Sequence, residues 1–195
     1  MQSLYDPSLQ LATAINNAKA FYPRSDNRQP HYVLVISHTN RLRINRATNE
    51  RLARGRMDTR LLKPSEVSPG SMANLPQDMH VWPGIKLQGC VKQREQNIVN
   101  GLEYEIRSTT DTIVQLRQLH PSGDAAKHGE PFELLHEETA NKFRLQHALC
   151  YYTAQGRTLR DGLVICTDTD HKAFSIRHLI VGIGRVGVAI DMEVM

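Results

Sequence analysis

Residues 32–55 read YVLVISHTNRLRINRATNERLARG, and this stretch decides the fold. Its first six residues form a short, largely β-branched apolar run, which is typical of a strand buried on both faces of a parallel sheet. A polar turn follows, and then a helical register that ends at Gly55 and comprises Leu42, Asn45, Asn49 and Leu52. A strand, a polar turn and a helix in this order begin a βα unit, so the stretch predicts an α/β domain.

The residues towards the two ends of the chain extend this α/β pattern. Residues 8–22 predict a helix, because apolar side chains share one face at Leu11, Ile15, Ala18 and Tyr22. A helical register returns at residues 134–143, and DGLVICTD (161–168) predicts another buried strand. We expect a short helical segment within residues 171–179 and then a strand at LIVGIG (179–184).

The middle of the chain has a different character. Residues 57–84 hold four of the nine prolines and no sustained period, so they predict a connector with short strands at most. Residues 84–119 predict a small antiparallel β-module, with a hairpin turn at Asn100-Gly101 and two strands around a polar turn in YEIRSTTDTIVQL. We therefore expect residues 1–83 and 120–195 to form the α/β domain, interrupted by the module at 84–119.

Length and composition set the broad class. At 195 residues, with 40% hydrophobic and 23% charged residues, the chain has the make-up of one globular domain. No apolar run reaches the roughly 20 residues of a membrane span, and the first residues lack a signal peptide's pattern. The cysteines are far apart and odd in number, which argues against a disulfide framework or a CxxC metal site: Cys90, Cys150 and Cys166. We expect a reduced, intracellular compartment, either nucleus or cytoplasm, and no membrane association.

Positive charge is concentrated in one segment. The whole chain has a net charge of only +4, but residues 41–60 hold seven arginines against Glu50 and Asp58. From charge alone, the commoner meaning is a solvated helix face. The use of arginine in place of lysine favours contact with phosphate, because the planar guanidinium fork suits oxyanions.

Gly182, Gly184 and Gly187 match the G-x-G-x-x-G fingerprint of dinucleotide-binding folds. Only eight residues follow Gly187, too few for the helix, the next strand and the acidic residue about 20 positions on that binds ribose. We interpret the match as a false positive and keep a dinucleotide-binding fragment as the least favoured alternative.

Two further features admit a phosphate-binding interpretation beside a plainer one. Arg185 follows an apolar run and could stabilise charge on a transferring phosphoryl group, or simply form a surface ion pair. The turn TAQGRT (153–158) could present polar groups to a phosphate, or be no more than a polar turn. The Asn100-Gly101 turn is explained by hairpin geometry without any function.

Several catalytic classes lack their motifs. The nine histidines form no metal-binding spacing, and there is no G-x-S-x-G elbow. The sequence contains no Gly-Lys dipeptide, so it has no P-loop with which to cradle a nucleoside triphosphate.

The order of these segments resembles the second RecA-like domain of superfamily 1 DNA helicases of the RecD-like and Pif-like kind. VLVISHTNRLRIN resembles that family's motif IV, and IVNGLEYEI resembles the Asn-Gly hairpin of its inserted barrel. ALCYYTAQGRTL resembles motif V, and HLIVGIGRV resembles motif VI. The likeness covers about residues 31–188 and implies a RecA-like, mostly parallel sheet flanked by helices, with a small antiparallel β-barrel-like insertion.

The resemblance also implies roles for particular residues. Arg185 corresponds to the motif VI arginine, which acts on the γ-phosphate as a catalytic residue. The expected nucleotide contacts are Asn40, Arg41, Gln155 and Gly156. The expected contacts to single-stranded DNA are Thr153, Thr158, Asn100 and Arg43. ATP and Mg²⁺ are then held mainly by a separate P-loop-bearing RecA-like domain, in the same or another chain.

The sequence departs from the family at both later motifs. Tyr152, Thr153 and Ala154 stand where His-Lys-Ser is frequent, which removes donors to the DNA backbone. Gly184 replaces a serine before the arginine, and Ile180 replaces an aromatic residue. These changes suit a divergent helicase of a virus or mobile element, or a decayed copy.

Two main hypotheses follow. The chain is the second motor domain of an ATP-dependent helicase, inactive as an ATPase alone, or it is a non-enzymatic nucleic-acid-binding module of the same ancestry. In the second case the arginine-rich segment and the inserted module would grip phosphate backbones.

Overall fold

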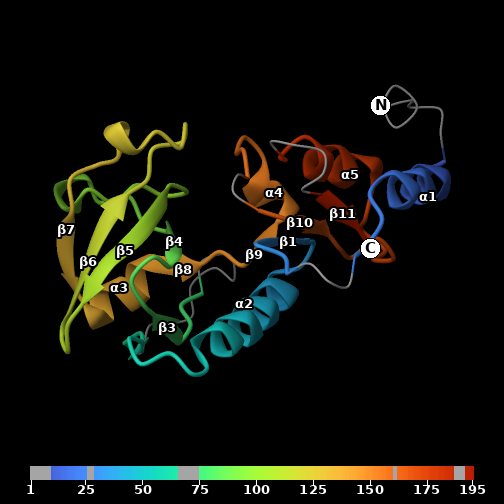
Figure 1. Cartoon of the computed structure of the whole chain (residues 1–195). Helices are drawn as coiled ribbons and strands as arrows, with labels where there is room; N and C mark the ends of the chain where they lie inside the picture. Colours follow the sequence, from blue (N-terminus) through green and yellow to red (C-terminus); the bar gives the residue numbers. More distant parts are fainter. Residues whose placement is uncertain (1–9, 26–28, 66–74, 160–161, 187–191) are drawn as a thin grey trace. The chain divides into compact units, whose positions relative to one another are not determined.

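The computed structural model describes residues 10–25, 29–65, 75–159, 162–186 and 192–195 (Figure 1). The chain forms two compact units, which we describe separately. The first comprises Met1–Arg41 and His147–Met195, and the second comprises Leu42–Gln146. Within the described residues, no helix is long and apolar enough to cross a membrane.

A parallel sheet of four strands forms the centre of the first unit. Its order is β11-β10-β1-β9, and every neighbouring pair is parallel. The strands are β1 (Tyr32–Val35), β9 (Ala148–Cys150), β10 (Val164–Cys166) and β11 (Met192–Val194). The predicted buried strands in 32–37 and 161–168 are confirmed. Strand β11 was not predicted, because the charged Glu193 interrupts its short apolar run.

Three helices pack on one face of this sheet: α1 (Leu11–Phe21), α4 (Tyr151–Ala154) and α5 (Ile176–Ile183). Their buried side chains form one apolar cluster with the strands, which includes Ala14, Ala18, Leu34, Leu149, Cys166, Leu179 and Val194. Each fully buried side chain of leucine size contributes roughly 1.5–3 kcal/mol to stability. The predicted helix at 8–22 is confirmed over its described residues.

The predicted strand at LIVGIG is wrong, because these residues belong to helix α5. His178 Nδ1 accepts the backbone N–H of Ser175 at 3.0 Å and so caps the first turn. Leu179 and Ile183, four residues apart, are buried on the sheet side. A short apolar run has no period of its own with which to distinguish a buried strand from a buried helix.

Gly182 lets α5 approach the sheet closely. A Cβ atom at this position would lie 2.3 Å from Cys166 Sγ, well inside van der Waals contact. The first glycine of the G-x-G-x-x-G match is therefore required for helix packing. All three cysteines are buried as free thiols: Cys90, Cys150 and Cys166.

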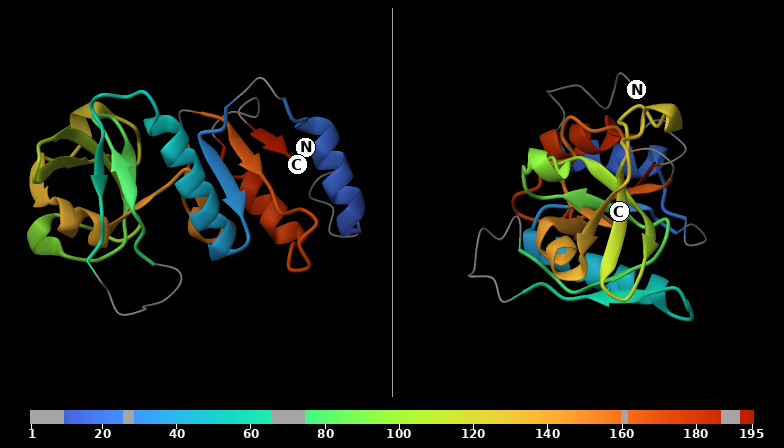
Figure 2. Two further views of the ribbon diagram at one scale, coloured as in Figure 1. Left: turned by 90° about the horizontal axis from the view of Figure 1, so that it is seen from below. Right: turned by 90° about the vertical axis from the view of Figure 1, so that its left-hand side faces the viewer.

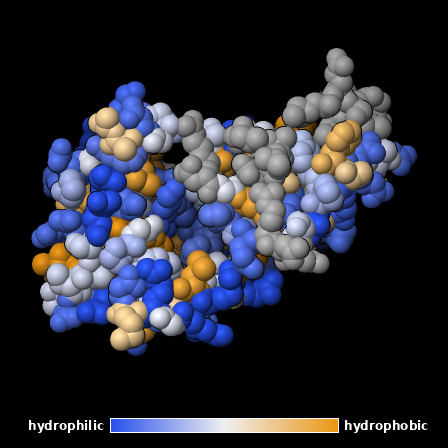
Figure 3. All heavy atoms as spheres, viewed as in Figure 1, coloured by the Kyte–Doolittle hydropathy of each residue, from blue (hydrophilic) through white to orange (hydrophobic). Residues whose placement is uncertain are grey.

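The second unit contains a five-stranded antiparallel sheet in the order β7-β6-β5-β4-β8. Its strands are β4 (Lys86–Gly89), β5 (Glu103–Thr109), β6 (Ile113–Gln118), β7 (Phe132–Leu135) and β8 (Phe143–Leu145). The same unit contains helix α3 (His136–Lys142) and the 3₁₀ turns η3 (Arg94–Gln96) and η4 (Ala125–Lys127). Tyr104, Phe143 and Leu116 lie in its apolar core, and most of the visible surface of this unit is hydrophilic (Figure 3).

This sheet runs further along the chain than the expected module at 84–119, because β7 and β8 also belong to it. Each of these strands has only three or four residues, too few to show an alternating pattern. A separate antiparallel pair, β2 (Arg60–Leu62) and β3 (Met79–Val81), lies in the segment predicted as a connector with short strands (Figure 2).

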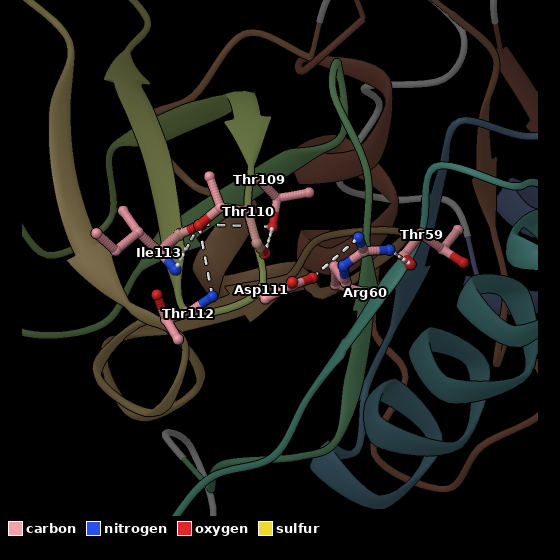
Figure 4. A network of polar contacts seen from close by, with 7 residues as sticks. All are labelled: Thr59, Arg60, Thr109, Thr110, Asp111, Thr112 and Ile113. Carbon is pink, nitrogen blue, oxygen red and sulfur yellow. Dashed lines mark hydrogen bonds and ion pairs between the residues drawn. The ribbon is translucent and has the colours of Figure 1, made fainter.

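Asn100-Gly101 is a turn, but it is not the two-residue hairpin that was predicted. The N–H of Leu102 donates to Val99 O at 3.3 Å, and Gly101 has φ +87°. The connection between β4 and β5 is longer, since it also includes η3. The tight hairpin lies between β5 and β6, where Thr110 Oγ1 accepts the N–H of Ile113 at 3.1 Å, and Arg60 pairs with Asp111 at 3.2 Å (Figure 4).

Helix α2 (His38–Ala53) begins in the first unit, and its residues from Leu42 onward belong to the second. All three of its buried residues are polar: Arg41, Asn45 and Asn49. Asn45 Nδ2 donates to Leu145 O at 3.1 Å. Asn49 donates to His80 O at 2.8 Å and accepts the His80 N–H at 2.7 Å. These amides fix α2 to β8 and β3 where apolar contacts would normally do so.

We predict that Asn49→Ala lowers the free energy of unfolding by about 1–3 kcal/mol, because it leaves two backbone groups of His80 without partners. Urea unfolding followed by circular dichroism measures this change. Asn16→Ala makes the same substitution at an exposed helical position and should change stability far less. Equal effects of the two substitutions would contradict the structural role of Asn49.

We also predict that Gly182→Ala destabilises the chain by about 1–3 kcal/mol through overpacking against Cys166, although alanine favours a helix by about 1 kcal/mol. In a Cys166→Ala background the clash is gone, so Gly182→Ala should become neutral or stabilising. Thermal unfolding of the four proteins of this cycle tests the sign change. A cost that persists without Cys166 would rule out the proposed contact.

Candidate functional site

The carboxyl ends of β1, β9 and β10 lie at one edge of the parallel sheet, because these strands run in the same direction. Polar residues follow each strand directly. Ser37 to Asn40 follow β1, Tyr151 and Tyr152 follow β9, and Thr167 and Asp168 follow β10. This edge is where ligands bind in open α/β sheets.

Asp168 joins the end of β10 to the start of α2. Its Oδ2 accepts the backbone N–H of Ile36 at 2.9 Å, and Asn40 Nδ2 donates to its two carboxylate oxygens at 3.3 and 3.4 Å. Ser37 Oγ accepts the N–H of Asn40 at 3.1 Å, which caps the helix. Asp168 has φ +61°, a left-handed conformation that is uncommon outside glycine. The predicted nucleotide-contact residue Asn40 is therefore held in a fixed position.

His38 contacts two residues that follow or end β9. Its Nε2 lies 3.1 Å from the hydroxyl of Tyr152, and its Nδ1 lies 3.5 Å from Cys150 Sγ. Burial, and to a lesser extent the positive charge of Arg41, lower the pKa of His38. Tyr152 is 59% exposed and meets the His38 ring edge to face.

Burial makes Cys150 a poor candidate for a nucleophile. Its side chain is buried, and this burial raises the pKa of the thiol, which disfavours the reactive thiolate. Arg41, the second predicted nucleotide contact on α2, is only 7% exposed. Its positive charge lies close enough to Cys150 and His38 to lower the pKa of each, though at Cys150 the effect of burial is larger. A buried guanidinium there supplies positive potential to the edge.

Arg185 lies beside the glutamine-glycine bend, and it follows a helix where a strand was predicted. Its Nη1 donates to Arg157 O at 3.2 Å, and its own carbonyl accepts the N–H of Leu159 at 2.7 Å. The bend itself is open to solvent, since Gln155, Gly156 and Thr158 are exposed. The φ of +82° at Gly156 explains why a glycine stands there.

The guanidinium of Arg185 retains unused donor capacity. Its Nε is buried and has no hydrogen-bond partner among the described residues. Buried donors are normally paired, so an unpaired one asks for an explanation. A phosphate or carboxylate oxygen at this place would satisfy it.

The remaining predicted contacts belong to different units. Thr153 is partly exposed in α4, in the first unit. Arg43 is exposed on α2 and Asn100 is exposed in the turn before β5, both in the second unit. The roles of these three residues in binding DNA stay predictions.

The dinucleotide alternative is not supported by the local structure. The fingerprint requires a strand before the glycines, whereas Gly182 lies within α5 and Gly184 caps its end. Gly187 lies outside the described residues. The match arises by chance: Gly182 is needed for helix packing, and Gly184 ends the helix.

Sequence reasoning missed Asp168, His38 and Thr167. Thr167 donates both its N–H and its hydroxyl to Leu34 O, at 3.0 and 2.8 Å, and so fixes the end of β10 against β1. Their common signal is position, since each follows a buried strand within a few residues. No group of three or more His, Cys, Asp or Glu side chains that could hold a metal ion occurs in the described ranges.

No family model and no curated protein matches the chain. Solved structures do resemble it. Bacteroides Pif1 bound to ssDNA matches with a TM-score of 0.65 and 11% identity, over 99% of this chain and 47% of that one. Bacteroides Pif1 in complex with ADP-AlF3 and ssDNA matches with a TM-score of 0.61 and 13% identity, over 99% and 47%.

Candida albicans Pif1 helicase matches with a TM-score of 0.61 and 13% identity, over 100% of this chain and 52% of that one. The chain therefore spans about half the length of these helicases. Its parallel four-stranded sheet flanked by helices, together with the antiparallel five-stranded sheet, has the fold found in Pif1 helicases.

Proposed function

We propose that this chain is the second motor domain of an ATP-dependent DNA helicase and works with a P-loop-bearing RecA-like domain, in the same or another polypeptide. The observation that carries the proposal is the position of Arg185. It lies against the bend at Gln155–Thr158, with a buried Nε that has no hydrogen-bond partner in the part of the chain that the structure describes, in a chain with the fold of Pif1 helicases.

In this proposal, ATP with Mg²⁺, held mainly by the P-loop domain, supplies the phosphoryl group that is transferred. Arg185 stabilises the negative charge that develops on that group, an effect worth about 10³–10⁵ in rate in enzymes where it has been measured. The contact of Nη1 with Arg157 O orients the guanidinium. The exposed Gln155 and Gly156 offer an amide and a backbone N–H to the nucleotide.

The edge built around Asp168 has a supporting role. The carboxylate of Asp168 fixes Asn40, and the buried Arg41 adds positive potential, which favours an anionic ligand at the ends of β1 and β10. Thr153, Thr158, Asn100 and Arg43 contact nucleic acid in this proposal. Support comes from the Pif1 structures that contain ssDNA and ADP-AlF3.

We expect the isolated chain to show no appreciable ATP hydrolysis, because it has no P-loop. In a protein or mixture that includes the P-loop domain, Arg185→Ala should lower the rate of ssDNA-stimulated ATP hydrolysis by about 10³-fold or more. A coupled ATPase assay measures this rate. Arg177→Ala, which removes an exposed arginine from helix α5, the helix that precedes Arg185, is the control. Robust hydrolysis that is independent of Arg185 would contradict the proposal.

A gain of function tests the DNA contact in α4. Thr153→Lys adds a cation at the partly exposed Thr153. We expect it to tighten binding of single-stranded DNA several-fold and to steepen the salt dependence by about 0.7 per added phosphate contact. Fluorescence anisotropy with a labelled oligonucleotide gives both values. Ala20→Lys adds the same charge at an exposed position of α1, and an equal gain from it would remove the support for Thr153.

A further inference from the structure

An arginine stripe, which we define as Arg43, Arg51 and Arg54, lies on the solvent side of helix α2 and in the turn directly after it. At 3.6 residues per turn, Arg43 and Arg51 fall within about 80° of one another around the helix. The buried Asn45 and Asn49 lie on the opposite side. At about 1.5 Å per residue, Arg51 lies roughly 12 Å along the axis from Arg43, and Arg54 follows in the turn, where its N–H donates to Arg51 O at 3.4 Å. All three arginines are exposed.

The arginines of the stripe form no ion pair among the described residues. The carboxylates within residues 41–60 are already engaged, because Glu50 pairs with Arg46 at 2.9 Å and Asp58 pairs with Arg56 at 2.9 Å.

This short segment accounts for the whole positive excess of the protein. Residues 41–60 hold seven arginines and two carboxylates, a net charge of +5, whereas the full chain is +4. The other 175 residues therefore hold 17 basic and 18 acidic side chains. Within this segment, the three arginines of the stripe are exposed and form no ion pair with a described residue, and clustered exposed basic side chains of this kind are the electrostatic footprint of a polyanion-binding surface.

The chemistry of the stripe favours a phosphate backbone. Arginine binds phosphate oxygens through two parallel hydrogen bonds. Helix α2 contains no Phe, Tyr or Trp, so it offers no platform on which unpaired bases could stack. A protein partner would require apolar or aromatic anchors, but the stripe encloses only Ala47 and Glu50. A row of phosphates on a rigid duplex fits a straight, rigid row of arginines best.

We propose that the arginine stripe of α2 is a contact surface for the phosphate backbone of double-stranded DNA. It is a second nucleic-acid surface, in a different unit from the Arg185 bend, and it requires no nucleotide. Since Arg43 is also one of the proposed nucleic-acid contacts, the inference rests on that part of the proposed function and assigns the contact to duplex DNA.

The test measures binding of the full chain to a labelled duplex of about 20 base pairs and to one of its strands, over about 50–200 mM salt. The triple variant Arg43→Gln/Arg51→Gln/Arg54→Gln should bind the duplex at least about tenfold more weakly, with a salt slope shallower by about 2.7 for three lost phosphate contacts. The loss for the single strand should be smaller.

The control variant Lys19→Gln/Lys172→Gln/Arg177→Gln removes the same charge from the first unit and should change duplex affinity by no more than about twofold. Circular dichroism and urea unfolding establish that both variants are folded. Equal losses in the two triple variants would show a net-charge effect only and overturn the inference. Unchanged duplex binding, or a loss confined to the single strand, would also overturn it.

The outcome can be separated from that of the helicase proposal. Arg185→Ala should change duplex affinity by no more than about twofold, because in the proposed function Arg185 acts on the nucleotide and it is not part of the stripe. If the P-loop mixture shows no Arg185-dependent hydrolysis while the stripe variant still loses duplex affinity, the helicase proposal fails and the stripe stands. If hydrolysis depends on Arg185 but the stripe variant keeps its duplex affinity, the helicase proposal stands and the stripe proposal fails.

Discussion

Hydrogen bonds from the buried asparagines of α2 are the constraint on which much of the structure depends. A helix without a buried apolar residue has little hydrophobic reason to dock, so its position depends on Asn45 and Asn49. Amides buried in this way must be satisfied, and only one orientation of the helix satisfies them. That orientation leaves the arginine stripe in solvent.

A few hydrogen bonds also fix the edge of the parallel sheet. Asp168 accepts hydrogen bonds from the backbone of Ile36 and from the side chain of Asn40, so one carboxylate organises two strand ends and a helix start. Its left-handed backbone conformation is an energetic cost that the surrounding bonds offset. Rigid support of this kind is what a site needs to hold ligand-binding groups in place.

Much of the fold could be predicted from the sequence, because strong periods and turn residues encode it locally. The strand at 32–37 and the helix ending near Gly55 were of this kind. Failures occurred where the signal was short or mixed. Helix α5 has too few residues to show a period, and β11 has a charged residue in its centre. Arg185 and the bend were proposed through resemblance and stay predictions as site residues, whereas Asp168 was not proposed, because its hydrogen bonds depend on strands distant in sequence.

The burial of all three thiols has a practical consequence. Alkylating reagents attack exposed thiolates, and none of the native cysteines offers one. A single cysteine introduced at an exposed position such as Ala20 would therefore be the preferred attachment point for a fluorescent dye. The wild-type chain already has the background that conformational spectroscopy usually has to create by removing cysteines.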